Sequence, residues 1–268
     1  MDILSIIGLL GAVAFIVFGI SFDSVDFSVD FGLVMNFLDI PSALLVIGPT
    51  LMSLMLMFPS KVFAGLPKVF KKVFMPQKFN PQNYITQIVE IATDVRRNGL
   101  LSMDEKMEAF EDEFMRKGIQ LAVDSTDPEM IREIMETELG FMVDRHKLGT
   151  QWFEKGAALA PAFGMVATLV GLINMLGDMD NPESLVANMG MAMITTVYGC
   201  LLANVFFLPM GNKLQKRSDE EVLCKQIVIE GVISIVNGEN PNTIREKLVS
   251  YIPPSMRTLS SSARDAGD

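Results

Sequence analysis

Four long apolar stretches alternate with charged segments along the chain, and they fall into two pairs. The stretches run Ile3–Ile20, Ile40–Phe58, Ala160–Leu176 and Asn188–Met210, and none contains Asp, Glu, Lys, Arg or His. Each is close to the roughly 20 apolar residues that cross a bilayer as an α-helix. The first lacks the basic start and the cleavage site of a signal peptide, so we expect it to be retained. The pattern predicts an all-α integral membrane protein with four transmembrane helices.

Charge is distributed unevenly over the segments that flank these stretches. The loops within the two pairs carry only acidic charges, namely Asp23, Asp26, Asp30, Asp39, Asp178, Asp180 and Glu183. The opposite flanks are rich in basic charges, namely Lys61, Lys68, Lys71, Lys72, Lys78, Lys213, Lys216 and Arg217. Because basic flanks stay on the cytoplasmic side of a membrane, we expect the middle segment and both termini in the cytoplasm.

Helical periodicity fills the segment between the two pairs. Asn80-Pro81 is expected to start a helix that ends near Gly99, and Ser102 with Glu105 has the form of a capping box that opens a second. The second is expected to end near Gly118 and a third to start at Asp127-Pro128. The sequence thus predicts a first transmembrane hairpin with an acidic outer loop (1–58), a cytoplasmic helical domain (59–152), a second transmembrane hairpin (153–210), and an amphipathic helix with a polar tail (211–268).

The composition and the missing motifs argue against several classes of function. The net charge is −10, which opposes binding to nucleic acid because phosphate recognition needs a basic surface. Cys200 and Cys224 are too few for a disulfide framework, and His146 has no Cys or His at a metal-ligand spacing. The phosphate-binding, zinc-protease and nucleophile-elbow motifs are all missing from the sequence. We therefore expect neither an enzyme nor a bound cofactor or metal.

Small residues recur at about every fourth position of the third apolar stretch. They are Gly156, Ala160, Gly164, Ala167 and Gly171. Small faces let helices approach closely. One interpretation is packing within the chain, and the other is a groove that accepts a helix from a different chain.

Three threonines and two prolines are the remaining features of the second hairpin. Thr168, Thr195 and Thr196 either bond to their own helix carbonyls or line an ion path with their hydroxyl oxygens. Pro161 and Pro209 each remove a backbone hydrogen bond and permit a kink, which is either structural or a place where a span bends.

Two pairs of charges lie close together in the cytoplasmic segment. Arg96 and Arg97 fall at the end of one predicted helix, and Asp104 and Glu105 fall in the first turn of the next. Favourable interaction with the helix dipoles explains all four as well as any contact with a partner does.

Several stretches resemble the A subunit family of the bacterial flagellar motor stator, the MotA/PomA family within the MotA/TolQ/ExbB group. The match covers nearly the whole chain and is most specific from Asp144 to Leu172, where the sequence reads DRHKLG, then APAFGMVATLVGL. TTVYG from Thr195, FFLP ending at Pro209, and GENP from Gly238 to Pro241 add to it. Ala167 departs from the family, because many relatives have glycine at that position.

The resemblance implies a bacterial inner-membrane protein that forms a homopentamer around a MotB-type B-subunit dimer. The B subunit would supply an ion-binding aspartate and an anchor to peptidoglycan, and H+ or Na+ would be the transported ion. Arg96, Arg97, Asp104 and Glu105 would contact a FliG-type switch protein of the rotor. Pro161 and Pro209 would couple ion transfer to movement, and Thr168 and Thr196 would face the partner's aspartate. Membrane lipids would surround the assembly.

Two alternatives stay open. A TolQ/ExbB-type subunit would energise another envelope process, but those relatives have three spans and this sequence predicts four. A non-conducting scaffold would merely anchor a cytoplasmic helical domain. Because no titratable carboxylate lies in the four spans, a conducting complex must obtain it from a partner.

Overall fold

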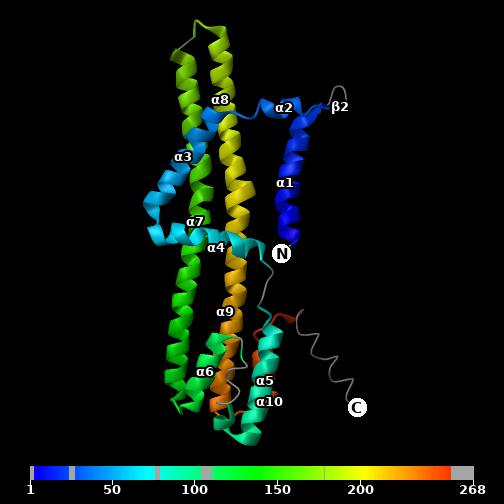
Figure 1. The fold of residues 1–268 in the computed structure, drawn as a ribbon, viewed down its shortest axis with the longest axis vertical. Helices are drawn as coiled ribbons and strands as arrows, with labels where there is room; N and C mark the ends of the chain where they lie inside the picture. Colours follow the sequence, from blue (N-terminus) through cyan, green and yellow to red (C-terminus); the bar gives the residue numbers. More distant parts are fainter. Residues whose placement is uncertain are drawn as a thin grey trace. The chain divides into compact units, whose positions relative to one another are not determined.

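A computed structural model of the chain describes residues 3–23, 28–75, 79–103, 110, 112–177 and 179–254 (Figure 1). Nearly all of these residues are helical, as the sequence predicts. They divide into two compact units, Met1–Gln77 with His146–Gln215, and Lys78–Arg145 with Lys216–Asp268. Each unit is therefore assembled from two separate parts of the sequence.

The first unit contains the apolar helices. Its elements are α1 (Ile3–Ser21), β1 (Phe22–Asp23), β2 (Ser28–Val29), α2 (Gly32–Met35), α3 (Ile40–Met57), α4 (Ser60–Phe74), the later part of α7 (Pro128–Gly177), α8 (Pro182–Leu201), the π-helix η2 (Leu202–Phe207) and the start of α9 (Leu208–Val236). Within the described ranges, four helices are long and apolar enough to cross a membrane: Ile3–Ser21, Ile40–Met57, Pro128–Gly177 and Pro182–Val236. The prediction of four transmembrane helices is confirmed.

Asn-Pro and Asp-Pro pairs set the starts of four helices. Asn80, Asp127, Asn181 and Asn240 each accept a hydrogen bond from the backbone N–H two residues later, at 3.0–3.1 Å. The proline that follows each one occupies the first helical position, where a missing N–H costs nothing. Because both effects are local, these starts could be predicted from the sequence alone.

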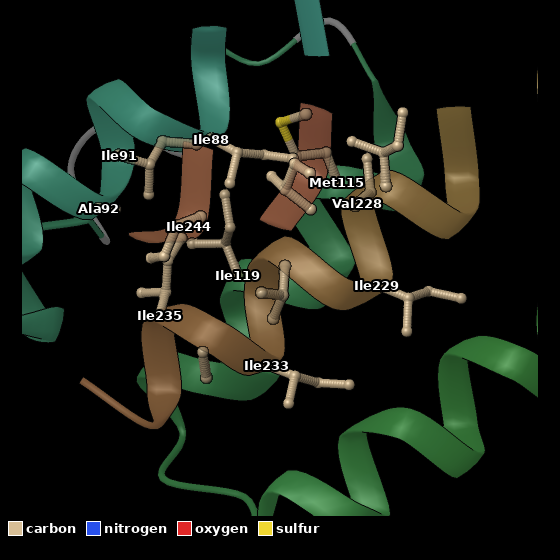
Figure 2. Close-up of a cluster of buried hydrophobic side chains, with 14 of the residues drawn as sticks. Ile88, Ile91, Ala92, Met115, Ile119, Val228, Ile229, Ile233, Ile235 and Ile244 are labelled. Atoms are coloured by element: carbon tan, nitrogen blue, oxygen red, sulfur yellow. The ribbon is translucent and has the colours of Figure 1, made fainter. Parts of the chain in front are cut away.

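The second unit is built around a compact hydrophobic core. It contains α5 (Pro81–Asn98), α6 (Glu113–Val123), the early part of α7, the later part of α9 and α10 (Pro241–Val249). Figure 2 shows side chains from α5, α6, α9 and α10 meeting in this core, among them Ile88, Met115, Ile119, Val228 and Ile244. Ile88, Met115 and Ile244 are almost fully buried.

Two local predictions need correction. The helix expected to end near Gly118 continues to Val123. Gly118 does not end the helix; it allows close packing, because a Cβ there would lie 2.6 Å from the Met135 methyl. Ser102 lies in a short 3₁₀ turn at residues 100–103, and the cap of α6 is Asp112. The outer loop also contains a two-residue antiparallel pair, Phe22 opposite Val29, which leaves the all-α fold class unchanged.

Candidate functional site

Helices α7 and α8 form a hairpin (Figure 1), and they pack closely through their small residues. A Cβ added at Gly164 would lie 3.1 Å from the carbonyl oxygen of Thr195, and one at Gly171 would lie 3.0 Å from the Ala192 Cβ. The five small residues Gly156, Ala160, Gly164, Ala167 and Gly171 are all buried. The packing interpretation of this face is confirmed. The groove interpretation is wrong for it, because the chain's own α8 and η2 already occupy the space.

This close packing brings the three predicted threonines together. The Thr168 Oγ1 atom, on α7, lies 2.6 Å from Thr196 Oγ1 and 3.4 Å from Thr195 Oγ1, both on α8. Thr168 Oγ1 also lies 3.0 Å from the carbonyl oxygens of Gly164 and Ala192. Thr195 is fully buried, Thr168 is half-buried and Thr196 is exposed. The cluster therefore has one open side, and Thr196 faces it.

The distances limit how the three hydroxyl protons can be used. A hydroxyl has one proton to donate and two lone pairs that accept. Thr195 donates to the Ala192 carbonyl at 2.9 Å, and Thr168 donates to one of its two carbonyl neighbours. Thr196 Oγ1 lies 2.6 Å from Thr168 Oγ1, where either hydroxyl can donate, and 3.4 Å from the Ala192 carbonyl, to which it can also donate. The exposed Thr196 oxygen is left with its lone pairs, which suit a cation or a protonated carboxyl group.

The two predicted coupling prolines occupy different surroundings. Pro161 lies within α7, against α8, where a Cβ on Gly199 would come 3.1 Å from its Cα. Pro209 is the second residue of α9, which follows η2 directly. A proline lacks an N–H and its ring crowds the carbonyl four residues earlier, which here is Val205, inside η2. The wider π-helical turn accommodates that crowding, and such turns are frequent at sites where a helix deforms. The side-chain amide of Asn204 donates to the Cys200 carbonyl at 3.0 Å beside this turn.

Sequence reasoning did not single out Tyr198 and Gly199, although both lie in the TTVYG motif. The Tyr198 hydroxyl donates to the Phe37 carbonyl at 2.5 Å and accepts from the Asp39 N–H at 3.0 Å. It thereby ties α8 to the start of α3 and holds the two hairpins together. Gly199 allows the helices to touch, since a Cβ there would lie 2.7 Å from the Ala160 carbonyl oxygen. The continuation of the small-residue spacing onto the fourth span was the signal available for Gly199.

The four predicted rotor charges are only partly described. Arg96 and Arg97 are exposed in the last turn of α5. Asp104 and Glu105 lie outside the described residues. Within the described ranges no three His, Cys, Asp or Glu residues gather closely enough to hold a metal ion.

A buried charge cluster lies in the second unit. The Lys225 ammonium is 2.7 and 2.8 Å from the two oxygens of Asp112, and it lies 5.1 Å from the centre of the Phe114 ring. The Tyr84 hydroxyl donates to Asp112 at 2.6 Å. Burial raises the pKa of Asp112, but the hydrogen bonds from Lys225 and Tyr84 outweigh burial and keep that pKa below its ordinary value. Burial and the neighbouring Asp112 raise the pKa of Tyr84. The cluster is thus a charged pair with a neutral donor.

The chain is similar to named proteins along nearly its whole length. The model of the MotA/TolQ/ExbB proton channel family matches residues 106–227. Motility protein A of Treponema pallidum (strain Nichols) is 38% identical over 257 residues, which is 96% of each chain. Chemotaxis protein PomA of Vibrio alginolyticus is 35% identical over 259 residues, 97% of this chain and 98% of that protein. The solved structure of the flagellar MotAB stator complex from Bacillus subtilis contains a chain that is 31% identical with a TM-score of 0.83, covering 94% of this chain and 97% of that one.

Proposed function

This chain belongs to the MotA/TolQ/ExbB proton channel family, and from that premise we propose that it works as the A subunit of an ion-driven flagellar motor stator. Near-complete coverage of proteins named for motility and similarity to a solved stator complex support this function. Four candidate spans favour it over the three-span TolQ/ExbB-type relatives.

The observation that carries the proposal is the open Thr168–Thr196 pair in spans that contain no Asp, Glu, Lys, Arg or His. Hydroxyl oxygens can coordinate a passing cation but do not take up an extra proton at neutral pH, so the chain needs a carboxylate from elsewhere. A B subunit with an aspartate in its transmembrane helix would supply it. The lone pairs of the exposed Thr196 oxygen are the group on this chain that the aspartate or its ion would meet.

The outward faces of α7 and α8 are where such a partner would bind. Exposed apolar side chains continue on both helices, including Met165 and Leu169 on α7 and Met189 and Met193 on α8. Thr196 is an exposed polar residue on the same helix as the exposed Met189 and Met193, a combination that suits contact with a helix carrying a single carboxylate. We propose a pentamer of this chain around a dimer of MotB-type subunits, as the resemblance implies.

The proposed orientation places the inner (cytoplasmic) membrane around the four spans, with both termini and the second unit in the cytoplasm. The acidic loops and the basic flanks support it. Arg96 and Arg97 would then be presented to a FliG-type rotor protein, together with Asp104 and Glu105. Their exposure at the end of α5 is compatible with such a contact. The transported ion would be H+ or Na+.

Replacing Thr196 by Val tests the proposal, because valine keeps the shape and removes the hydroxyl. The matched control is Thr50→Val in α3, where the hydroxyl is buried and donates to its own Val46 carbonyl at 2.6 Å. We expect Thr196→Val to reduce ion-driven rotation severely in tethered cells. Assembly should change little, since an interhelical hydroxyl contact is worth about 1 kcal/mol. Equal rotation in the two variants over a range of pH and sodium concentrations would remove Thr196 from the ion path.

A further inference from the structure

A cavity of about 260 Å³ lies in the first unit, away from the three threonines of the proposed ion path. It is an open cavity lined by α1, the end of α4, η2 and the start of α9. We propose that it binds an acyl chain of an anionic phospholipid from the cytoplasmic leaflet, with the lipid headgroup at Lys213. The proposal rests on the membrane orientation given under the proposed function.

The walls of the cavity suit a hydrocarbon chain. Leu9, Phe74 and Met210 contribute apolar side chains, and Gly8 and Ala12, one turn apart on α1, leave the wall recessed. A Cβ added at Gly8 would meet nothing within 4 Å, so the space beside this glycine is open. Apolar burial is favourable in proportion to the area covered, and a methylene chain fills such a slot without needing polar partners.

The polar part of the lining carries positive charge. It consists of Ser5, Asn204 and Lys213, and the described lining contains no Asp or Glu. The Lys213 ammonium donates to the Ser5 hydroxyl, which holds the charge beside the start of α1. An apolar slot with an ammonium group at a span end has the chemistry of a phospholipid site.

Helix α4 adds a basic surface next to the cavity. Its residues Val73 and Phe74 line the cavity, and the exposed Lys71 and Lys72 directly precede them. The helix carries two more exposed lysines, Lys61 and Lys68, and no acidic residue. Its apolar face is anchored in the first unit through Phe70, whose ring lies 5.2 Å from Phe153 and 6.2 Å from Trp152. The helix is thus amphipathic, as expected for a helix lying in the membrane interface.

The occupant would touch the segment around Pro209, a residue that the resemblance implies couples ion transfer to movement. Val205 of η2 and Pro209 of α9 both line the cavity. A lipid chain at this place would support the wide turn that precedes Pro209. An anionic headgroup explains the lysines, whereas an apolar surface of a second copy of this chain would not.

Native mass spectrometry of the intact assembly recovered from membranes tests the proposal directly. Phosphatidylglycerol or phosphatidylcholine with the same acyl chains is added, and the lipid retained per copy of the chain is counted. Retention of phosphatidylglycerol should exceed that of phosphatidylcholine by about fivefold, the factor that one lysine near an anionic surface supplies. Gly8→Leu should remove the retained lipid by filling the cavity. Gly11→Leu is its matched control, because a Cβ at Gly11 also meets nothing within 4 Å and Gly11 does not line the cavity.

A second pair of variants tests the proposed contact between Lys213 and the lipid headgroup. Lys213→Gln should lower the preference for phosphatidylglycerol while leaving phosphatidylcholine retention unchanged, and Lys61→Gln, at the far end of α4, should preserve that preference. If Gly8→Leu protein is not recovered, Ala12→Leu is used in its place, because Ala12 lines the same side of the cavity and a leucine there would also fill it. Equal retention of the two lipids by the unaltered chain would overturn the proposal. So would disassembly of the complex by Gly8→Leu with unchanged lipid retention, which would identify the cavity as a contact between copies. Lipid retention is measured without ion flow or rotation. A negative result for the lipid site can therefore be distinguished from a failure of the proposed stator function.

Discussion

At the scale of single residues, Asp112 performs two tasks at once. One of its oxygens accepts from the N–H groups of Phe114 and Met115 and so caps α6, and both oxygens pair with the buried Lys225. Asp112→Asn would leave the Lys225 ammonium buried without its counter-charge. Breaking such a pair costs about 3–5 kcal/mol, and we expect a loss of that order in the free energy of unfolding of the purified protein.

The lowered pKa of Asp112 also predicts how the stability of the folded protein depends on pH. The pKa of Asp112 is lowered in the folded protein, so its contribution is complete above the ordinary value of 3.8 and is lost as the pH falls through the lowered pKa. The melting temperature of the unaltered protein should fall over this acidic range, and that of Asp112→Asn should fall less. Lys117→Gln is the control, since it breaks an exposed ion pair with Glu138 that is worth about 0–1 kcal/mol. Parallel pH profiles for the unaltered protein and Asp112→Asn would contradict the assigned pairing.

At the scale of elements, the α7–α8 contact depends on Gly199. Gly199→Ala would place a Cβ 2.7 Å from the Ala160 carbonyl, so the two helices must separate. We expect a lower melting temperature and reduced rotation, because the Thr168–Thr196 distance would increase. Gly190→Ala, in the same helix, meets nothing within 4 Å and should change stability by no more than about 1 kcal/mol. Similar melting temperatures for the two variants would show that the contact is not tight.

The sequence predicts correctly those elements that are determined by residues close together in the chain. The four spans follow from runs of apolar residues, and the end of α5 at Gly99 follows from a glycine with a positive φ of 82°. Gly118 was misread because its reason is the Met135 side chain, which packs there from another helix. The π-helical turn before Pro209 and the Tyr198 hydrogen bonds also depend on neighbours that the local pattern does not contain. The threonines could be selected from the sequence, but only the fold shows that Thr196 is the one that faces outward.

At the scale of the whole molecule, the distribution of basic residues predicts the orientation in the membrane. In a background with Cys200→Ser and Cys224→Ser, Asp180→Cys should react with an impermeant thiol reagent in intact cells, because it lies in an acidic outer loop. Lys117→Cys, exposed on α6, should react only after the cells are opened. Labelling of Lys117→Cys in intact cells would reverse the proposed topology and, with it, the leaflet assigned to the lipid cavity.

The central claim is that this chain provides an ion path but not the ion-binding carboxylate. It rests on the open Thr168–Thr196 pair and on four spans that contain no Asp, Glu, Lys, Arg or His. The direct test measures H+ and Na+ flux into liposomes that contain the chain alone or the chain with its MotB-type partner. We predict no flux above background for the chain alone, flux for the complex, and loss of flux when the carboxylate in the partner's transmembrane helix is replaced by an amide. Flux through the chain alone, or through the complex with the amide, would contradict the claim.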